Sequence, residues 1–278
     1  MRVIESIAEM KQTRLDMTNT VGFVPTMGFL HNGHLELVRK AKADNSAVVV
    51  SIFVNPAQFG PQEDYTSYPR DIPRDVTMLG TAGTDIIFIP TTVEMYTPHF
   101  NTWIDIEKIT TGLEGASRPG HFRGVATVCN KLFNIVQPTN AYFGQKDAQQ
   151  CVVIKRMVAD LNMNLNIVVV PTVRETDGLA MSSRNTYLKP KERQAATVLY
   201  RSLNLAKDMW VKGEKDAQNI RNAMIEVIHQ EPLAEKIDYI SIAHPETLQE
   251  MDEIVPPVLI SLAVKIGKPR LLDNIIIE

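Results

Sequence analysis

The sequence comprises 278 residues, of which 44% are hydrophobic and 22% charged, with a formal net charge of −3. These values are typical of a globular protein with one large domain or two ordinary ones. The charges are interspersed, so no basic patch indicates a nucleic-acid partner. No apolar run approaches the roughly 18 residues of a membrane span. Acidic residues interrupt the N-terminal segment, which lacks a continuous apolar core, so we do not expect it to be a signal peptide.

Two cysteines, Cys129 and Cys151, are present, each among apolar neighbours. We expect both to be buried, reduced side chains of a cytoplasmic protein, with a disulfide or a catalytic thiol as the alternatives. No Cys/His cluster has the spacing of a zinc site.

Strand-like and helix-like segments alternate over about the first 170 residues. Short apolar runs predict strands at 21–24, 47–53, 85–89, 141–143 and 167–170. Helical patterns separate them at 35–43, 73–79, 125–136 and 148–161. This alternation predicts an α/β fold with a Rossmann-like, doubly wound parallel sheet. Such sheets bind ligands beyond the carboxyl ends of their strands.

The pattern changes after Thr172. Pro190 opens a predicted helix that runs through Trp210 to a stop at Gly213, and a second helix is predicted at 216–230. Strands are predicted at 237–242, 258–266 and 270–277. Helices followed by strands indicate a smaller C-terminal α+β domain. We therefore predict two domains, 1–172 and 173–278.

The segment 25–34, PTMGFLHNGH, joins the first predicted strand to the first predicted helix. Such a junction places backbone N–H groups and a positive dipole end where an anion can bind. His31 and His34 can converge on one ligand if His34 lies in the first helical turn. His-x-Gly-His after a strand resembles the arrangement of nucleotidyltransferases that attack the α-phosphate of ATP. Taken alone, the segment also fits a βα turn with two solvated histidines.

Polar groups follow the next strand as well. Asn55 and Gln58 can both donate to and accept from a small ligand, although Asn-Pro is also an ordinary turn signal. Residues 118–124, RPGHFRG, combine two arginines with a histidine beside a helix start. That cluster suits a phosphate or carboxylate, with a solvated basic loop as the alternative.

Two later segments suit a nucleotide. Lys146 follows a strand and a glycine turn, where a compact cation can contact phosphate oxygens. Asp147 beside it can cap the following helix, and Gln150 lies one turn after Lys146 on the same face. Residues 181–184, MSSR, offer two hydroxyls and a guanidinium that can hold a triphosphate as charge moves onto pyrophosphate. A Ser-rich interdomain linker is the alternative.

The P-loop, the G-x-G-x-x-G fingerprint and the G-x-S-x-G elbow are all absent from the sequence. Together, the segments described above resemble the pantothenate synthetase (pantoate–β-alanine ligase) family. The segments that carry the resemblance span residues 25 to 274, in this order: PTMGFLHNGH, VSIFVNPAQFG with the following YPR, RPGHFRGV, FGQKDAQQ, VRETDGLAMSSRN and RLLDN.

The resemblance implies a reaction in two steps. The carboxylate of pantoate attacks the α-phosphate of Mg-ATP, which gives pantoyl adenylate and pyrophosphate. The amine of β-alanine then displaces AMP and forms pantothenate, a coenzyme A precursor. The family also implies Mg²⁺ as cofactor, a C-terminal lid domain and a homodimer. No enzyme nucleophile is needed, in agreement with the absence of a Ser-His or Cys-His pairing.

The resemblance also assigns site residues. His34, His31, Lys146 and Arg184 stabilise charge in the adenylation transition state. Gln58 contacts pantoate and β-alanine, Gln150 contacts pantoate, and Asp75 falls near a position associated with Mg²⁺. The implied ATP-binding residues are Met27, Gly28, Phe29, Leu30, His31, Asn32, Gly33, His34, Gly144, Gln145, Lys146, Asp147, Val173, Met181, Ser182, Ser183 and Arg184.

Phe29 departs from the family pattern, because a smaller residue is common there. Two other functions remain as alternatives. One is a related nucleotidyltransferase that acts on another small acid or a phosphate ester. The neutral amides of Gln58 and Gln150 argue against it, because they suit a hydroxy acid better than a phosphate ester. The other is a noncatalytic nucleotide sensor, which would not need the complete set of charge-stabilising side chains.

Overall fold

The computed structural model describes residues 1–61 and 63–278. The chain divides into two compact units. The first consists of Met1–Gly144 and Val153–Pro171, and the second of Gln145–Val152 and Thr172–Glu278. The second unit thus takes in a short segment that precedes residue 172.

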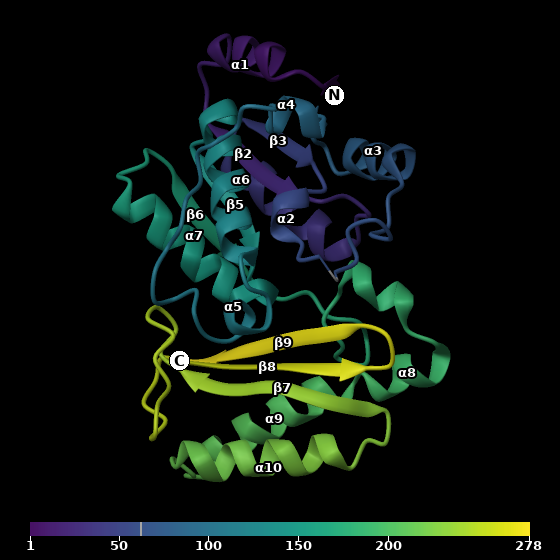
Figure 1. Ribbon diagram of the computed structural model, residues 1–278, viewed down its shortest axis with the longest axis vertical. Helices are drawn as coiled ribbons and strands as arrows, with labels where there is room; N and C mark the ends of the chain where they lie inside the picture. Colours follow the sequence, from purple (N-terminus) through teal and green to yellow (C-terminus); the bar gives the residue numbers. More distant parts are fainter. Residues whose placement is uncertain (62) are drawn as a thin grey trace. The chain divides into compact units, whose positions relative to one another are not determined.

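The first unit is built on a six-stranded, fully parallel sheet with the strand order β1-β4-β3-β2-β5-β6. Figure 1 labels β2, β3, β5 and β6 of this sheet. Its strands are β1 (Arg2–Ile4), β2 (Val21–Thr26), β3 (Ala47–Ile52), β4 (Ile86–Phe88), β5 (Asn140–Gly144) and β6 (Asn166–Val170). This topology confirms the predicted Rossmann-like α/β fold. The chain proceeds outward from β2 through β3 to β4 and then returns to β5 on the other side of β2. The carboxyl ends of β2 and β5 therefore flank the switch point, where open α/β sheets bind ligands.

Helices connect the strands of the first unit. They are α1 (Ile7–Leu15), α2 (Asn32–Asp44), α3 (Ile72–Thr81), α4 (Thr92–Met95), α5 (Glu114–Ser117) and α6 (His121–Val136), with the 3₁₀ turn η1 (Pro56–Gln58). The 3₁₀ turn η2 (Gln145–Asp147) and the first five residues of α7 (Ala148–Asp160) belong to the second unit, and the rest of α7 belongs to the first. The sequence did not predict β1 or α1. In the three-residue β1 only Ile4 is buried, and in α1 only Met10 is, so neither element has the apolar pattern that revealed the others.

The second unit contains the antiparallel sheet β7 (Ala234–Ala243), β8 (Val258–Ile266) and β9 (Arg270–Ile277). It also contains η3 (Ser183–Tyr187), α8 (Pro190–Ala195), α9 (Val198–Val211) and α10 (Ala217–His229). The prediction of one helix through Trp210 is wrong, because α8 and α9 are separate. The N–H of Thr197 donates to the carbonyl of Gln194, three residues back, which interrupts the regular α-helical ladder.

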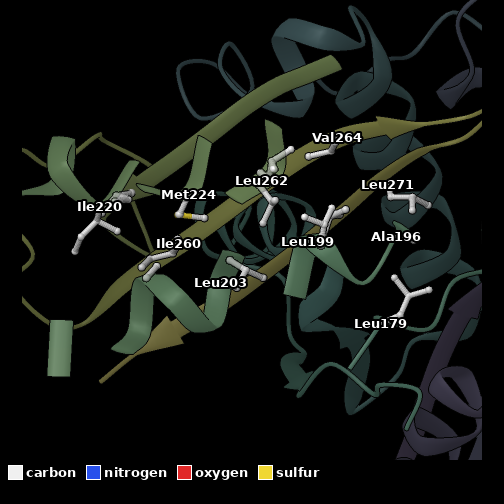
Figure 2. Packing of buried hydrophobic residues seen from close by; sticks show 14 of the residues in the cluster. Leu179, Ala196, Leu199, Leu203, Ile220, Met224, Ile260, Leu262, Val264 and Leu271 are labelled. Carbon is white, nitrogen blue, oxygen red and sulfur yellow. The ribbon is translucent and has the colours of Figure 1, made fainter. Parts of the chain in front are cut away.

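The core of the second unit lies between the sheet and α9 and α10. Leu199 and Leu203 of α9, together with Met224 of α10, pack against Ile260 and Leu262 of β8 (Figure 2). All five side chains are at most 1% exposed. Leu179, in the loop that precedes η3, belongs to the same cluster. The predicted α+β character of this part of the chain is therefore confirmed.

None of the helices within residues 1–61 and 63–278 has the length and apolar character needed to cross a membrane.

Candidate active site

The two histidines of the first unit lie where β2 turns into α2. His31 caps the helix, and its Nδ1 accepts a hydrogen bond from the N–H of Gly33 at 3.2 Å. The N–H of His31 donates to Nδ1 of His34 at 3.3 Å, and the two ring centroids are 4.0 Å apart. Because each Nδ1 is an acceptor, each neutral ring carries its proton on Nε2. The two rings thus lie together, and each carries its donor hydrogen on Nε2.

The backbone of this turn is held by α3. Gly28 and Phe29 have φ of 81° and 48°, so consecutive residues are in the left-handed region. The N–H groups of Phe29 and Leu30 donate to Oδ2 and Oδ1 of Asp75 at 2.6 and 2.8 Å. Arg74 donates to the carbonyl of Leu30 at 2.9 Å, and its guanidinium lies 5.1 Å from the Phe29 ring centroid. The N–H groups of Phe29 and Leu30 therefore bind a protein carboxylate and are not directed at a ligand.

Asp75 is fully buried, and burial raises the pKa of its carboxyl group, while the two backbone hydrogen bonds act in the opposite direction. The sequence associated this residue with Mg²⁺. Both of its oxygens instead face N–H groups of the turn. Among the described residues, no group of three or more His, Cys, Asp or Glu side chains is arranged to hold a metal ion.

Gln58 lies in the 3₁₀ turn η1, which follows β3. It is 9% exposed, and its Nε2 lies 3.0 Å from Sδ of Met27. Its Oε1 accepts a hydrogen bond from Nδ2 of Asn55 at 3.2 Å, and Asn55 is itself 1% exposed. The structure therefore brings Gln58, which follows β3, together with the segment that follows β2, at the carboxyl edge of the sheet.

The basic segment 118–124 supports η1 and is not a solvated loop. The Arg118 guanidinium donates to both carboxylate oxygens of Glu63 at 2.8 and 2.6 Å. His121 is 8% exposed, and its Nδ1 lies 2.9 Å from the Gln58 carbonyl oxygen, which can only accept. Burial, together with the nearby Arg118, lowers the pKa of His121 to about 4. His121 is thus a neutral donor that fixes the main chain at Gln58.

A cavity of about 220 Å³ opens at the carboxyl edge of the same sheet. It is lined by the turn after β2, the segment after β3 and the segment after β4, including Gly28, Phe29, Phe53, Asp75 and Thr91. The ends of three neighbouring strands therefore frame one concavity, as expected of this topology.

The candidate phosphate-binding residues of the second unit share a cavity. Lys146, Ser182 and Arg184 line it together with residues 270–273. Oγ of Ser182 accepts the N–H of Arg184 at 3.3 Å and so begins η3. The N–H of Met181 donates to the Val173 carbonyl at 3.0 Å. Lys146 and Ser182 thus line one cavity although they lie 36 positions apart in the chain. The cavity brings together the ammonium group of Lys146, the hydroxyl of Ser182 and the guanidinium of Arg184.

Asp273 and Asn274 of β9 hold this cavity in place. Asn274 Nδ2 donates to the carbonyls of Gln145 and Lys146 at 3.0 and 2.8 Å. Arg174 donates to both oxygens of Asp273 at 2.6 and 3.0 Å, and its guanidinium lies 4.2 Å from the Tyr200 ring centroid. Asp273 and Asn274 are each 2% exposed. Burial raises the pKa of Asp273, while the arginine acts in the opposite direction.

The sequence alone assigned no role to Arg174, Asp273 or Asn274, whose side chains hold this cavity in place. Arg174 and the Asp-Asn pair occur in segments that carry the family resemblance, which was the only available signal. Nothing in the chain near Lys146 indicates that its carbonyl is bound by a residue 128 positions later.

Comparisons with known proteins show which family the chain belongs to. The family model described as pantoate-beta-alanine ligase matches residues 2–276. A pantothenate synthetase of Herpetosiphon aurantiacus is 56% identical over 277 residues, which cover 99% of this chain and 100% of the relative. A pantothenate synthetase of Roseiflexus castenholzii is 56% identical over 278 residues and is covered completely, as is this chain.

Solved structures show the same similarity. The crystal structure of pantothenate synthetase from Thermus thermophilus superposes with a TM-score of 0.95 at 47% identity and covers 99% of both chains. A pantoate-beta-alanine ligase from Francisella tularensis, complexed with beta-gamma ATP and beta-alanine, has a TM-score of 0.81 at 35% identity. That match covers 99% of this chain and 97% of the Francisella chain.

Proposed function

Because this chain belongs to the pantoate-beta-alanine ligase family, we propose that it condenses pantoate with β-alanine through a pantoyl-adenylate intermediate. A pantoate carboxylate oxygen attacks the α-phosphorus of ATP, and the bond to the bridging oxygen of the β-phosphate breaks, which releases pyrophosphate. The amine of β-alanine then attacks the acyl carbon and displaces AMP. The amine loses one proton, and pantothenate is formed.

The observation that carries this proposal is the placement of the predicted donors and cations: His31 and His34 lie together at the β2–α2 turn, and Lys146, Ser182 and Arg184 line one cavity. His31 and His34 would donate from Nε2 to phosphate oxygens, and Lys146 and Arg184 would neutralise the charge that moves onto pyrophosphate. Ser182 and Ser183 would add hydroxyl donors. Their work is positioning and electrostatic stabilisation, which suffices for a reaction between two bound substrates.

The remaining predicted contacts complete the proposal. Gln58 and Gln150 would bind the acid substrates through neutral amides, with Gln58 touching both pantoate and β-alanine. The rest of the ATP would lie against two further sets of residues: the turn residues Met27, Gly28, Phe29, Leu30, Asn32 and Gly33, and the residues Gly144, Gln145, Asp147, Val173 and Met181.

Mg²⁺ is the proposed cofactor. Asp75, the predicted ligand, already accepts two backbone hydrogen bonds, so its donor set does not fit a direct bond to the ion. We therefore propose that Mg²⁺ arrives with the phosphate oxygens of ATP, which is its usual mode of binding in nucleotide enzymes. When bound, it neutralises phosphate charge.

Pyrophosphate release tests this proposal. Protein, Mg-ATP and pantoate should give a single-turnover burst of pyrophosphate, and adding β-alanine should convert the burst into steady formation of AMP and pantothenate. No release under either condition, from folded protein that binds ATP, would contradict the proposal and favour a sensor. Release only with a different acid or with a phosphate ester would identify a related nucleotidyltransferase.

We also propose a homodimer that acts in the cytoplasm. The family resemblance supports both, and the two buried free cysteines suit a reducing compartment. Light scattering at several protein concentrations would measure the assembly, and a monomer at all of them would exclude the dimer.

A further inference from the structure

We propose that Tyr96 is a positioning residue, whose hydroxyl acts through Asn55 to hold the Gln58 amide with its NH₂ group directed toward the bound acid. The inference rests on the proposed function, in which Gln58 contacts the acid substrates. Tyr96 directly follows α4, and no motif in the sequence singled it out. The Tyr96 hydroxyl donates to Asn55 Oδ1 and not to Gln58, so its effect on Gln58 would be indirect, through Asn55.

Two backbone groups set the orientation of the Asn55 amide. The N–H of Ala57 donates to Asn55 Oδ1 at 3.3 Å, and Asn55 Nδ2 donates to the Gly124 carbonyl at 3.2 Å. An N–H can only donate and a carbonyl can only accept, so the amide cannot be turned end for end. The Tyr96 hydroxyl adds a hydrogen bond of 2.8 Å to Oδ1, shorter than either backbone contact.

The orientation of the Gln58 amide is set in the same way, by its hydrogen bond with Asn55. Asn55 Nδ2 lies 3.2 Å from Gln58 Oε1, which must therefore be the acceptor. Gln58 Nε2 then points away from Asn55, and it lies 3.0 Å from Met27 Sδ, a weak acceptor. A substrate that displaces this weak contact meets an NH₂ donor. Gln58 thus selects a carboxylate or hydroxyl oxygen and disfavours an ammonium group.

Tyr96 is well placed to act as a rigid support. Its ring centroid lies 5.1 Å from that of Phe100 and 6.2 Å from that of Trp103, and Lys131 Nζ lies 5.9 Å from the ring. Burial raises the pKa of Tyr96 above its ordinary value, so the hydroxyl remains a donor at neutral pH. Without that hydroxyl, Asn55 Oδ1 keeps only the longer bond from Ala57, and the amide pair gains freedom to move.

The test is a comparison of Tyr96→Phe with the unaltered enzyme. We expect the KM for pantoate to rise about 3- to 10-fold, the range for losing one hydrogen bond, while the KM for ATP stays unchanged. Tyr142→Phe is the matched control, because the Tyr142 hydroxyl also bonds an asparagine of the first unit, Asn45, at 2.7 Å. Its kinetic constants should equal those of the unaltered enzyme. An unchanged KM for pantoate in Tyr96→Phe would overturn the proposal.

A double-mutant cycle separates positioning from general loosening. If Tyr96 acts through Gln58, Tyr96→Phe should add no further change in KM for pantoate to a Gln58→Ala enzyme. An equal increase in both backgrounds would overturn the proposed positioning and leave the proposed function intact. If Gln58→Ala alone leaves the KM for pantoate unchanged, the assignment of Gln58 to the substrate fails, and the inference about Tyr96 fails with it.

Discussion

Backbone hydrogen bonds determine how the histidines at the β2–α2 turn can act. Since the N–H of His31 donates to His34 Nδ1, His34 presents its proton on Nε2, the atom suited to a phosphate oxygen. The pairing also explains why the motif requires a spacing of three residues. His34 must lie in the first helical turn to reach back to the capping residue.

Removal of this donor gives the first prediction. We expect His34→Ala to lower the rate of pyrophosphate formation by roughly 10²- to 10³-fold, the usual scale for losing one charge-stabilising donor. Single-turnover kinetics with pantoate and ATP measure that rate. His99→Ala removes an exposed histidine of the same unit and should leave the rate unchanged. A near-normal rate in folded His34→Ala would contradict the proposed role.

Asn274 gives a second prediction, for the cavity of the second unit that is proposed to bind phosphate. In Asn274→Ala, the half-buried carbonyls of Gln145 and Lys146 each lose the hydrogen bond from Asn274, which costs about 0.5–1.5 kcal/mol per bond. We expect the segment to shift and the KM for ATP to rise about 5- to 100-fold, with the KM for pantoate little affected. Asn219→Ala, at an exposed amide of the same unit, is the control. Equal KM values for ATP in the two variants would contradict the framing role of Asn274.

At this scale, the sequence predicted the residues that belong to compact motifs. His31 and His34 are three positions apart, and Ser182 and Arg184 are two apart, so local spacing suggests a shared ligand. Tyr96 and Asn274 act over long sequence separations through single neutral side chains. No periodicity or charge pattern marks such residues, and only the folded chain reveals their partners.

Among the elements of the first unit, α6 and η1 are in close contact. A Cβ atom added to Gly124 would lie 2.2 Å from the Ala57 carbonyl oxygen and 2.6 Å from the Gln58 nitrogen. Only glycine therefore allows the helix to approach the turn that carries Gln58. This packing explains the second glycine of the RPGHFRG segment, Gly124.

Gly124→Ala tests this contact. The added methyl group must push α6 away from η1, so we expect a loss of about 1–3 kcal/mol in the free energy of unfolding. The KM for pantoate should rise in parallel, because the Gly124 carbonyl also orients Asn55. Denaturant unfolding and steady-state kinetics measure the two effects. Gly83→Ala is not a suitable control, because Gly83 has a positive φ of 84°, which strains any other side chain. Gly144→Ala is not suitable either, because Gly144 is one of the predicted ATP-binding residues, although a Cβ atom there would meet open space. Asn134→Ala, at an exposed position of the same helix, is the control instead and should leave the KM for pantoate unchanged.

The sequence predicted most elements because buried parallel strands are nearly continuous apolar runs. β2 and β3, for example, were predicted within two residues at each end. The short β1 lacks such a run. At the break between α8 and α9, the N–H groups of Thr197 and Leu199 each donate to the carbonyl three residues back. Both features depend on a few backbone contacts and leave no pattern in composition.

For the whole molecule, His121 makes stability depend on pH. Its pKa is about 4 in the folded protein and about 6.5 in the unfolded chain. Between these values the unfolded chain binds a proton that the folded protein does not, so the free energy of unfolding falls as the pH drops from 6.5 to 4. The shift corresponds to at most about 3 kcal/mol.

Chemical unfolding at several pH values between 4 and 7 would measure this effect. His121→Gln keeps an amide donor for the Gln58 carbonyl and removes the titrating ring. We expect its stability to depend less steeply on pH than that of the unaltered protein. Curves that run parallel for the two proteins over this interval would show that His121 does not contribute.

The RLLDN segment in β9 has a consequence for the order in which the site forms. All six strands of the parallel sheet have left the ribosome once Val170 has been synthesised and extruded, and the histidine turn can form with them. The Lys146 carbonyl can accept its hydrogen bond from Asn274 only after Asn274, 128 residues later in the chain, has been synthesised. A nascent or truncated chain that stops short of β9 can therefore form the complete parallel sheet and still lack residues 270–273, which line the cavity beside Lys146. Under the proposed function, such a chain contains the histidine turn but not the complete cavity proposed to bind the phosphates of ATP.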